Sequence, residues 1–120
     1  MKDSNFIKEP PRVKSWGVSK PNFKDDYVII TKLEIDPFKS TTLHKHFKKN
    51  EMIKNISHDL KLNVVINNIE HILGFFETIS IKPGDIHKIS NKNNIKIEVL
   101  QIQFGENMSE EDKVIIMENL

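Results

Sequence analysis

Three of the five histidines form a pattern with one glutamate that can bind a metal ion. The chain reads His44-x-His46, then four residues, then Glu51, and His87 follows much later. Residues two apart on a β-strand point to the same face, so His44 and His46 would present two imidazoles side by side. Residues 48–50 can turn the chain and bring Glu51 back toward them, and His87 follows a Pro-Gly turn. Three neutral imidazoles and one carboxylate suit a divalent transition metal such as Zn, Fe, Mn, Ni or Cu, with positions open for water or substrate.

The other two histidines and the lack of cysteine limit which side chains could bind a metal. His58 and His71 have no partner at metal-ligand spacing, so we interpret them as structural or solvent-facing. The chain has no Cys, which excludes a disulfide framework, Cys-ligated zinc, an iron–sulfur cluster and a thiol nucleophile. A metal would therefore be bound by His, carboxylate or amide oxygen.

The elements that must position these side chains are short β-strands. Runs rich in β-branched and aromatic residues predict strands at 27–35, 41–46, 51–56, 60–66, 69–76, 78–81, 86–90 and 95–104. Asn67-Asn68 can adopt the positive φ of a tight hairpin, and 82–85 (Lys-Pro-Gly-Asp) fits a type II turn. Short strands joined by turns, with no long segment of helical period before residue 108, predict an all-β antiparallel sandwich or small barrel.

The N-terminal part of the chain differs from the rest. Residues 1–26 are polar and contain three prolines, which predicts an extended arm lying on a domain of residues 27–120. Trp16 is the exception in this arm. We expect its side chain to anchor the arm to the core, with contact to a ligand as the alternative.

Two segments have an ambiguous pattern. In 95–104 the apolar alternation shifts between Val99 and Leu100, so we expect a bulge or a strong twist there. Residues 109–118 could begin a helix at Ser109 or provide a last strand, and the pattern does not decide between them.

Composition excludes several classes of function. The chain has 120 residues, enough for one domain, and its 18 Lys and Arg nearly balance 17 Asp and Glu, for a net charge of +1. Arg12 is the single arginine, so the chain has only one of the planar guanidinium groups that nucleic-acid-binding proteins use to contact bases. We expect no nucleic-acid partner. No apolar run is long enough to span a bilayer or to act as a signal segment, so we expect a cytoplasmic protein without a membrane partner.

The metal-binding pattern resembles the two cupin motifs. The first is His-x-His-x4-Glu, seen as His44, His46 and Glu51. The second is Pro-Gly-x-x-His-x3-Asn, seen from Pro83 through His87 to residue 91, which is Asn. The resemblance implies a single-domain cupin, that is, a jelly-roll barrel or double-stranded β-helix, in which these three residues and His87 bind the metal.

A more specific resemblance covers nearly the whole chain, from about residue 12 to residue 118. The sequence is similar to the cupin domain of type II mannose-6-phosphate isomerases, which is often fused to mannose-1-phosphate guanylyltransferases. The matching segments are Ser15-Trp16-Gly17, Ile35-Asp36-Pro37-Phe38, Leu43 with His46, Lys49 and Glu51, Gln103-Phe104-Gly105 and Glu110-Glu111-Asp112. It departs from that pattern at a few positions, including His44 where the family usually has Gln and Phe38 where it has a turn Gly.

The resemblance implies aldose–ketose isomerisation of a phosphosugar, such as mannose 6-phosphate, at a divalent metal of unknown identity (Zn, Mn, Fe or Ni). Lys49, at the family's basic position, would bind the substrate phosphate, with Lys88 as a weaker candidate, and no residue is identified as the catalytic base. Two alternatives stay open. The first is a cupin that binds a sugar or nucleotide sugar without turnover in surface polysaccharide synthesis, and the second is an iron-dependent dioxygenase. By analogy with other cupins, we expect a homodimer.

Overall fold

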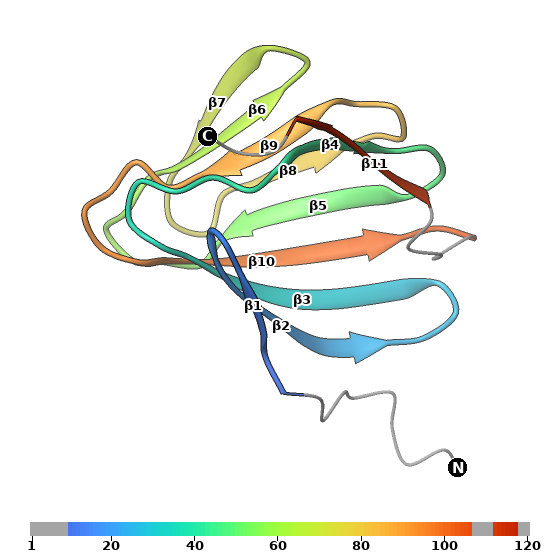
Figure 1. Ribbon diagram of the computed structural model, residues 1–120, viewed down its shortest axis with the longest axis horizontal. Coiled ribbons are helices and arrows are strands. Elements are labelled where there is room, and N and C mark those ends of the chain that lie inside the picture. Colours follow the sequence, from blue (N-terminus) through green and yellow to red (C-terminus); the bar gives the residue numbers. More distant parts are fainter. Residues whose placement is uncertain (1–9, 107–111, 118–120) are drawn as a thin grey trace.

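The computed structural model describes residues 10–106 and 112–117 of the chain, and these residues form eleven strands (Figure 1). The strands are β1 (Arg12–Lys14), β2 (Gly17–Lys24), β3 (Val28–Ile35), β4 (Leu43–His46), β5 (Asn50–Asn55), β6 (Leu62–Ile66), β7 (Ile69–Leu73), β8 (Thr78–Ile81), β9 (His87–Ser90), β10 (Ile97–Phe104) and β11 (Lys113–Met117). Within the described part of the chain, no helix is long and apolar enough to cross a membrane.

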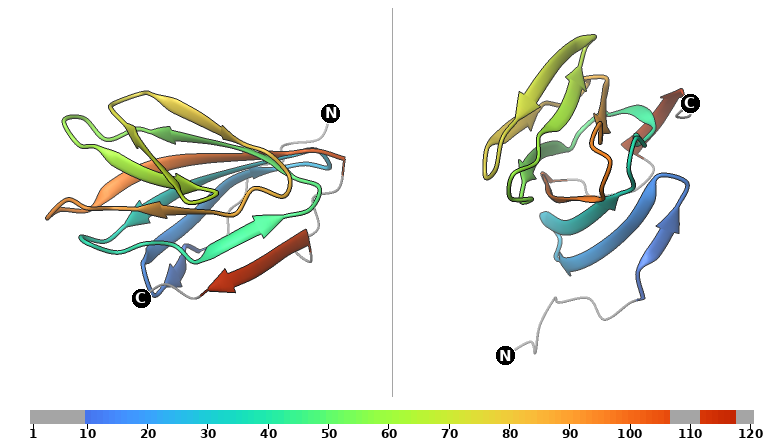
Figure 2. Two further views of the ribbon diagram at one scale, coloured as in Figure 1. Left: turned by 90° about the horizontal axis from the view of Figure 1, so that it is seen from above. Right: turned by 90° about the vertical axis from the view of Figure 1, so that its left-hand side faces the viewer.

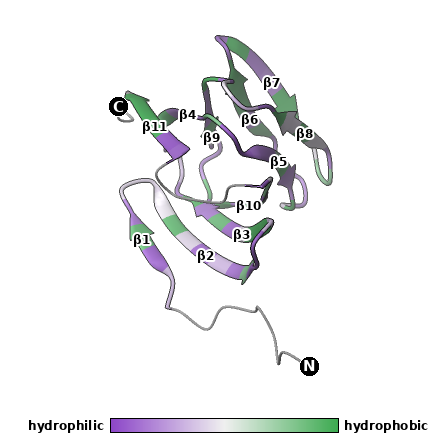
Figure 3. Cartoon of the chain, turned by 90° about the vertical axis from the view of Figure 1, so that its right-hand side faces the viewer, coloured by the Kyte–Doolittle hydropathy of each residue, from purple (hydrophilic) through white to green (hydrophobic). Residues whose placement is uncertain are grey.

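Two antiparallel sheets pack face to face and enclose the core (Figures 1 and 2). The six-stranded sheet has the order β1-β2-β3-β10-β5-β8, and the five-stranded sheet has the order β11-β4-β9-β6-β7. The edge strands β1 and β11 lie on the same side of the molecule, and β7 and β8 lie on the other (Figure 3). This arrangement confirms the predicted all-β, jelly-roll fold.

The two predicted turns lie where expected, but only one of them closes a hairpin: Asn67-Asn68 joins the paired strands β6 and β7, whereas the 82–85 turn joins β8 of one sheet to β9 of the other. Asn67 and Asn68 both have positive φ, 50° and 67°, as a tight β6–β7 hairpin requires. Gly84 has a φ of 88° in the predicted 82–85 turn, just before β9. Phe38 takes a φ of 59°, so the backbone is left-handed at a position where the resembling family has glycine.

The described part of the predicted arm is extended and forms strands. β1 and β2 pair with each other, and β2 pairs with β3 at the edge of the six-stranded sheet. Pro21, which has no amide hydrogen to donate, lies where the β2–β3 register shifts. Trp16 belongs to the buried core, as expected, and Gly17 is required beside it because a Cβ there would lie 1.9 Å from the Glu34 carbonyl oxygen. The division of the chain at residue 26 stays a prediction.

The expected irregularity in β10 is not a bulge. β10 pairs with β3 in continuous register from Ile97 to Phe104, through Val99 and Leu100. Inward-facing positions pass from Val99 to Gln101 and Gln103, which line a cavity, so polar residues replace apolar ones on the inner face. The apolar alternation shifted because the inner face changes from core to cavity.

The C-terminal segment provides a strand where it is described. Residues 113–117 form β11, which pairs antiparallel with β4. The predicted helix start at Ser109 and the acidic residues Glu110 and Glu111 lie outside the described residues.

The core lies between the two sheets. Its buried side chains are mainly branched aliphatic residues, namely Leu33, Ile35, Ile53, Leu62, Val64, Leu73, Ile81, Ile89, Ile97 and Val99, together with Trp16. Asn91, the last residue of the second cupin motif, is buried and donates hydrogen bonds to the carbonyl oxygens of Ile35, Asp36 and Ile95. This side chain therefore links the chain at residue 91 to the backbone at residues 35–36 and at residue 95.

Candidate metal centre

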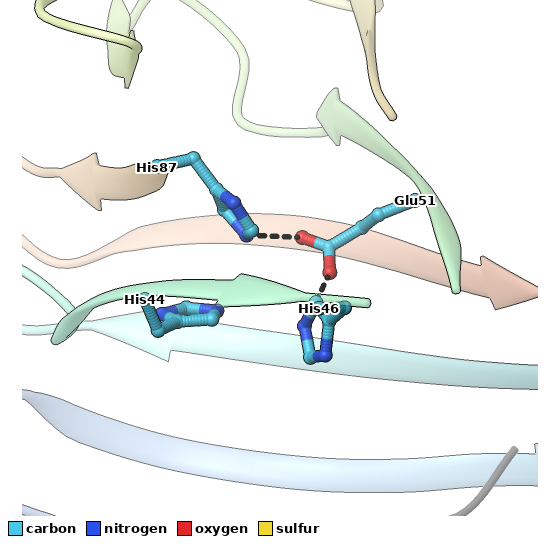
Figure 4. Close-up of side chains that lie close together, drawn as sticks. All are labelled: His44, His46, Glu51 and His87. Atoms are coloured by element: carbon cyan, nitrogen blue, oxygen red, sulfur yellow. Dashed lines mark ion pairs between the residues drawn. The ribbon is translucent and has the colours of Figure 1, made fainter. Parts of the chain in front are cut away.

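The fold brings the four predicted ligand residues together from three strands. His44 and His46 lie on β4, Glu51 on β5 and His87 on β9 (Figure 4). His44 and His87 are directly opposed in the β4–β9 pair, and Glu51 faces them from the other sheet. All four are buried, and one potential ligand atom of each lies within 4.8 Å of the others. The predicted convergence is confirmed, and metal binding by these residues stays a prediction.

The four side chains surround a common point. The His44 and His87 ring centroids are 4.3 Å apart, and His46 lies 5.3 Å from His44 and 5.8 Å from His87. The Glu51 carboxylate spans two of the rings, with Oε1 3.4 Å from His46 Nε2 and Oε2 3.6 Å from His87 Nε2. Figure 4 shows these two approaches as dashed lines.

Backbone carbonyl groups orient two of the imidazoles. His44 Nδ1 lies 2.8 Å from the Thr42 carbonyl oxygen, and His87 Nδ1 lies 2.9 Å from that of Asp85. A carbonyl oxygen can only accept, so each Nδ1 carries the hydrogen and each Nε2 presents a lone pair to the site. This is the supporting hydrogen bond that metal-binding histidines ordinarily have.

Buried polar atoms without partners test whether the cluster suits a metal. Among the described residues, His46 Nδ1, Glu51 Oε2 and His87 Nε2 are buried and have no hydrogen-bond partner. Such atoms are costly in a folded protein unless an ion or water satisfies them. The donor set of three imidazoles and one carboxylate fits a divalent transition metal, so these residues suit one.

The charges of the four side chains follow from their burial and from one another. Burial, together with the neighbouring His87 and Lys113, lowers the pKa of His44 to about 3, so this ring is neutral. Burial would raise the pKa of Glu51, but the close approach of the His46 and His87 rings outweighs it and holds the pKa well below its usual value. Burial lowers the pKa of His87, and the adjacent Glu51 carboxylate reverses this effect, so the net shift is upward. A negative carboxylate therefore lies among the three imidazoles.

A cavity of about 340 Å³ opens beside the cluster. Its wall includes His44 and His46, and residues of β1, β2, β3, β10 and β11 complete it. Lys49, the predicted phosphate contact, lines this cavity although only 3% of its surface is exposed. Lys88 does not line the cavity, because it alternates with the inward-facing His87 on β9. The geometry therefore supports Lys49 and gives no support to Lys88 as a substrate-binding residue.

Gln103 is a member of the site to which the sequence reasoning gave no role. Its Nε2 donates a hydrogen bond to Glu51 Oε1 at 3.2 Å and lies 3.5 Å from His46 Nε2. The side chain also lines the cavity. The alternation of β10 could have found it, because Gln103 shares a face with Val99. Gln103 orients Oε1 and leaves Oε2 directed at His87.

Comparisons with known proteins agree with this geometry. A sequence profile of the family described as "Mannose-6-phosphate isomerase C-terminal" matches residues 8–119. A mannose-1-phosphate guanylyltransferase of Sinorhizobium fredii (strain NBRC 101917 / NGR234) is 29% identical over 106 residues, which are 86% of this chain and 20% of that protein. The chain thus spans about a fifth of the length of this relative.

Solved structures share the fold at low sequence identity. The capsular polysaccharide assembling protein CapF from Staphylococcus aureus superposes with a TM-score of 0.74 at 19% identity, over 92% of this chain and 33% of that one. A protein with a double-stranded β-helix domain from Klebsiella pneumoniae subsp. pneumoniae MGH 78578 gives 0.73 at 12% identity, over 92% and 90% of the two chains. Oxalate decarboxylase from Bacillus subtilis gives 0.75 at 16% identity, over 93% and 31%.

Proposed function

The chain belongs to the mannose-6-phosphate isomerase C-terminal family of cupins, and on this premise we propose that it is a metal-dependent protein acting on a phosphosugar by aldose–ketose isomerisation. The observation that carries the proposal is the buried cluster of His44, His46, Glu51 and His87, in which His44 and His46 line the wall of a cavity that Lys49 also lines. These four residues would hold a divalent Zn, Mn, Fe or Ni ion.

Each group of the site has a part in this chemistry. A bound divalent metal supplies a Lewis acid that polarises the oxygens on adjacent carbons of a sugar. Glu51 contributes the negative charge that balances the ion, and the carbonyls behind His44 and His87 hold their rings in the ligating tautomer. The Lys49 ammonium group would bind the anionic phosphate, because it is the buried cation of the cavity wall. The four ligand residues and Lys49 are buried, and the low dielectric around them strengthens both interactions.

A second candidate function is binding of a sugar or nucleotide sugar without turnover. The observation that favours it is that, within residues 10–106 and 112–117, no Asp or Glu lines the cavity. Isomerisation requires a base that moves a proton between adjacent carbons, and a carboxylate is a common choice. The similarity to a mannose-1-phosphate guanylyltransferase is consistent with a sugar-nucleotide ligand.

The test is an activity assay on chelator-treated protein reloaded with one metal at a time. Conversion of mannose 6-phosphate to fructose 6-phosphate that requires Zn²⁺ or Mn²⁺ and is lost in His46→Ala supports the isomerase. Saturable binding of the sugar phosphate by calorimetry without conversion supports the non-catalytic alternative. Consumption of O₂ by the Fe²⁺-loaded protein would instead support a dioxygenase and contradict both proposals.

We also propose a homodimer and a cytoplasmic location. In the part of the chain that the structure describes, β1, β7, β8 and β11 are the edge strands of the two sheets, and a second copy could pair along one of them. The lack of cysteine is compatible with a reducing compartment. Light scattering after size-exclusion chromatography tests the dimer, and cell fractionation tests the location.

A further inference from the structure

Asp112, immediately before β11, is buried, with 8% of its surface exposed, although it carries a carboxylate. The carboxylate accepts hydrogen bonds from three consecutive backbone amides. Phe47 N donates to Oδ1 at 3.1 Å, Lys48 N donates to Oδ1 and Oδ2 at 2.9 and 3.0 Å, and Lys49 N donates to Oδ2 at 3.1 Å. The Asp112 carbonyl oxygen accepts a further bond from Phe47 N at 3.3 Å. The Asp112 side chain therefore accepts hydrogen bonds from the backbone amides of all three residues of this turn.

That turn joins two of the four candidate metal ligands. Residues 47–49 follow His46 directly and precede Glu51 by one residue, and Lys49 lines the cavity. Three amide groups directed at one point need an acceptor, since unpaired buried amides are unfavourable. A carboxylate gives stronger bonds to them than a neutral acceptor would. Burial raises the pKa of Asp112, and the amide bonds from Lys48, Lys49 and Phe47 outweigh burial and lower it, so the acceptor is ionised.

Other contacts fix the backbone of the same turn at His46 and at Lys48. The His46 carbonyl oxygen accepts a hydrogen bond from Gly84 N at 2.7 Å, which ties β4 to the turn before β9. Gly105 lies against the Lys48 carbonyl, where an added Cβ would be 3.3 Å from the oxygen. β11 continues from Asp112 along β4 and places Lys113 opposite His46. The turn is therefore held on several sides, and Asp112 supplies the charged contact.

We propose that Asp112 is a positioning residue of the metal centre: by binding the amides of residues 47–49 it holds the segment between His46 and Glu51 in the conformation that brings both to His44 and His87. This inference depends on one part of the proposed function, namely that the four residues bind a metal. A purely structural role predicts that replacing Asp112 lowers stability and leaves the metal affinity of the folded protein unchanged. A positioning role predicts that the affinity changes beyond the effect on stability.

The experiment compares Asp112→Asn with a matched variant in the same strand, Val114→Gly. Val114 pairs with Lys45 of β4, so glycine there weakens the strand pairing without removing an amide bond to the turn. Both variants are titrated with Co²⁺ alone, and binding is followed by the visible d–d absorption and by the fluorescence of Trp16, the single tryptophan, which lines the cavity. Melting temperature is measured on the same samples. Asp112→Glu, which keeps the charge, is titrated as a second variant in case Asp112→Asn does not fold.

We expect Asp112→Asn to weaken Co²⁺ binding at least about tenfold and to alter the d–d spectrum, as loss of supporting interactions does at other metal sites. We expect Val114→Gly to lower the melting temperature but to keep the affinity within about twofold and the spectrum unchanged, and Asp112→Glu to weaken binding less than Asp112→Asn. Equal affinities in wild type, Asp112→Asn and Asp112→Glu, or equal losses in Asp112→Asn and Val114→Gly, would overturn the positioning role while leaving the metal site intact. A wild-type protein that binds no Co²⁺ would overturn the proposed metal site itself, and with it this inference.

Discussion

Replacing Glu51 with glutamine separates the charge of the candidate metal site from its shape. Glu51 is the one carboxylate of the four-residue cluster, with 1% of its surface exposed. Glutamine has nearly the same size, and its carbonyl oxygen can still accept the hydrogen bond from Gln103. The variant loses the negative ligand that balances a divalent cation. We therefore expect a folded protein with a large loss of metal affinity.

The size of the effect follows from binding linkage. At a metal concentration of about 100 times Kd, binding stabilises the wild-type fold by about 2.7 kcal/mol. For a domain of this length, about 4 °C per kcal/mol converts this to a melting temperature about 11 °C higher. If the variant binds about 100-fold more weakly, the same metal concentration equals its Kd and adds about 0.4 kcal/mol, or about 2 °C.

The assay is thermal unfolding of chelator-treated protein over a titration with Zn²⁺ or Mn²⁺. Glu98→Gln is the matched control, because Glu98 lies on the neighbouring β10, pairs with Lys32 and has a partly exposed side chain outside the cluster. We expect wild type and Glu98→Gln to gain the same number of degrees and Glu51→Gln to gain almost none. Equal gains in Glu51→Gln and wild type would refute the assignment of Glu51 as a ligand.

Three further predictions follow from the same site and fold. Because Glu51 raises the pKa of His87, a metal must displace a proton from this ring. Zn²⁺ affinity should thus fall by up to about tenfold per pH unit as the pH is lowered through that pKa, and calorimetry that finds no proton release at about pH 6.5, the ordinary pKa of histidine, would contradict this. Lys49→Gln should weaken binding of a sugar phosphate at least about tenfold, while Lys88→Gln should change it little; calorimetry showing the opposite order would assign the phosphate contact to Lys88. Asn91→Ala should lower the free energy of unfolding by about 2–4 kcal/mol in urea, because it leaves three carbonyl groups without their donor, and a loss below about 1 kcal/mol would contradict this.

Local patterns predicted most of the strands and the metal cluster. His44 and His46 are two residues apart on a strand, so their common face follows from the pleat alone. The Asn67-Asn68 turn and the turn before His87 need positive φ, and Asn and Gly are among the few residue types that adopt it readily. These two features are local, and local physics is enough to predict them. Glu51 reaches the cluster differently from the expectation, because β4 and β5 belong to different sheets and the turn at 47–49 crosses from one sheet to the other.

The features that were missed depend on contacts between distant parts of the chain. The prolines of the N-terminal segment indicated an extended conformation, but the pairing of β2 with β3 depends on where the sheet has a free edge. The expectation of a bulge or a strong twist near Val99 assumed that inward residues are apolar, whereas Gln101 and Gln103 face a cavity. Asp112 binds amides 63 to 65 residues away, and no spacing rule connects them. A hydrophobic pattern cannot predict which polar residues face the interior of the protein. In this chain the inward-facing polar residues form the candidate site.

The central claim is that His44, His46, Glu51 and His87 together bind one metal ion. Anomalous diffraction from crystals of protein loaded to saturation with Zn²⁺, recorded on both sides of the zinc absorption edge, tests it most directly. We predict one anomalous peak per chain, about 2.0–2.2 Å from a nitrogen of each imidazole and an oxygen of Glu51. No peak among these side chains, or a peak held only by other residues, would contradict the claim.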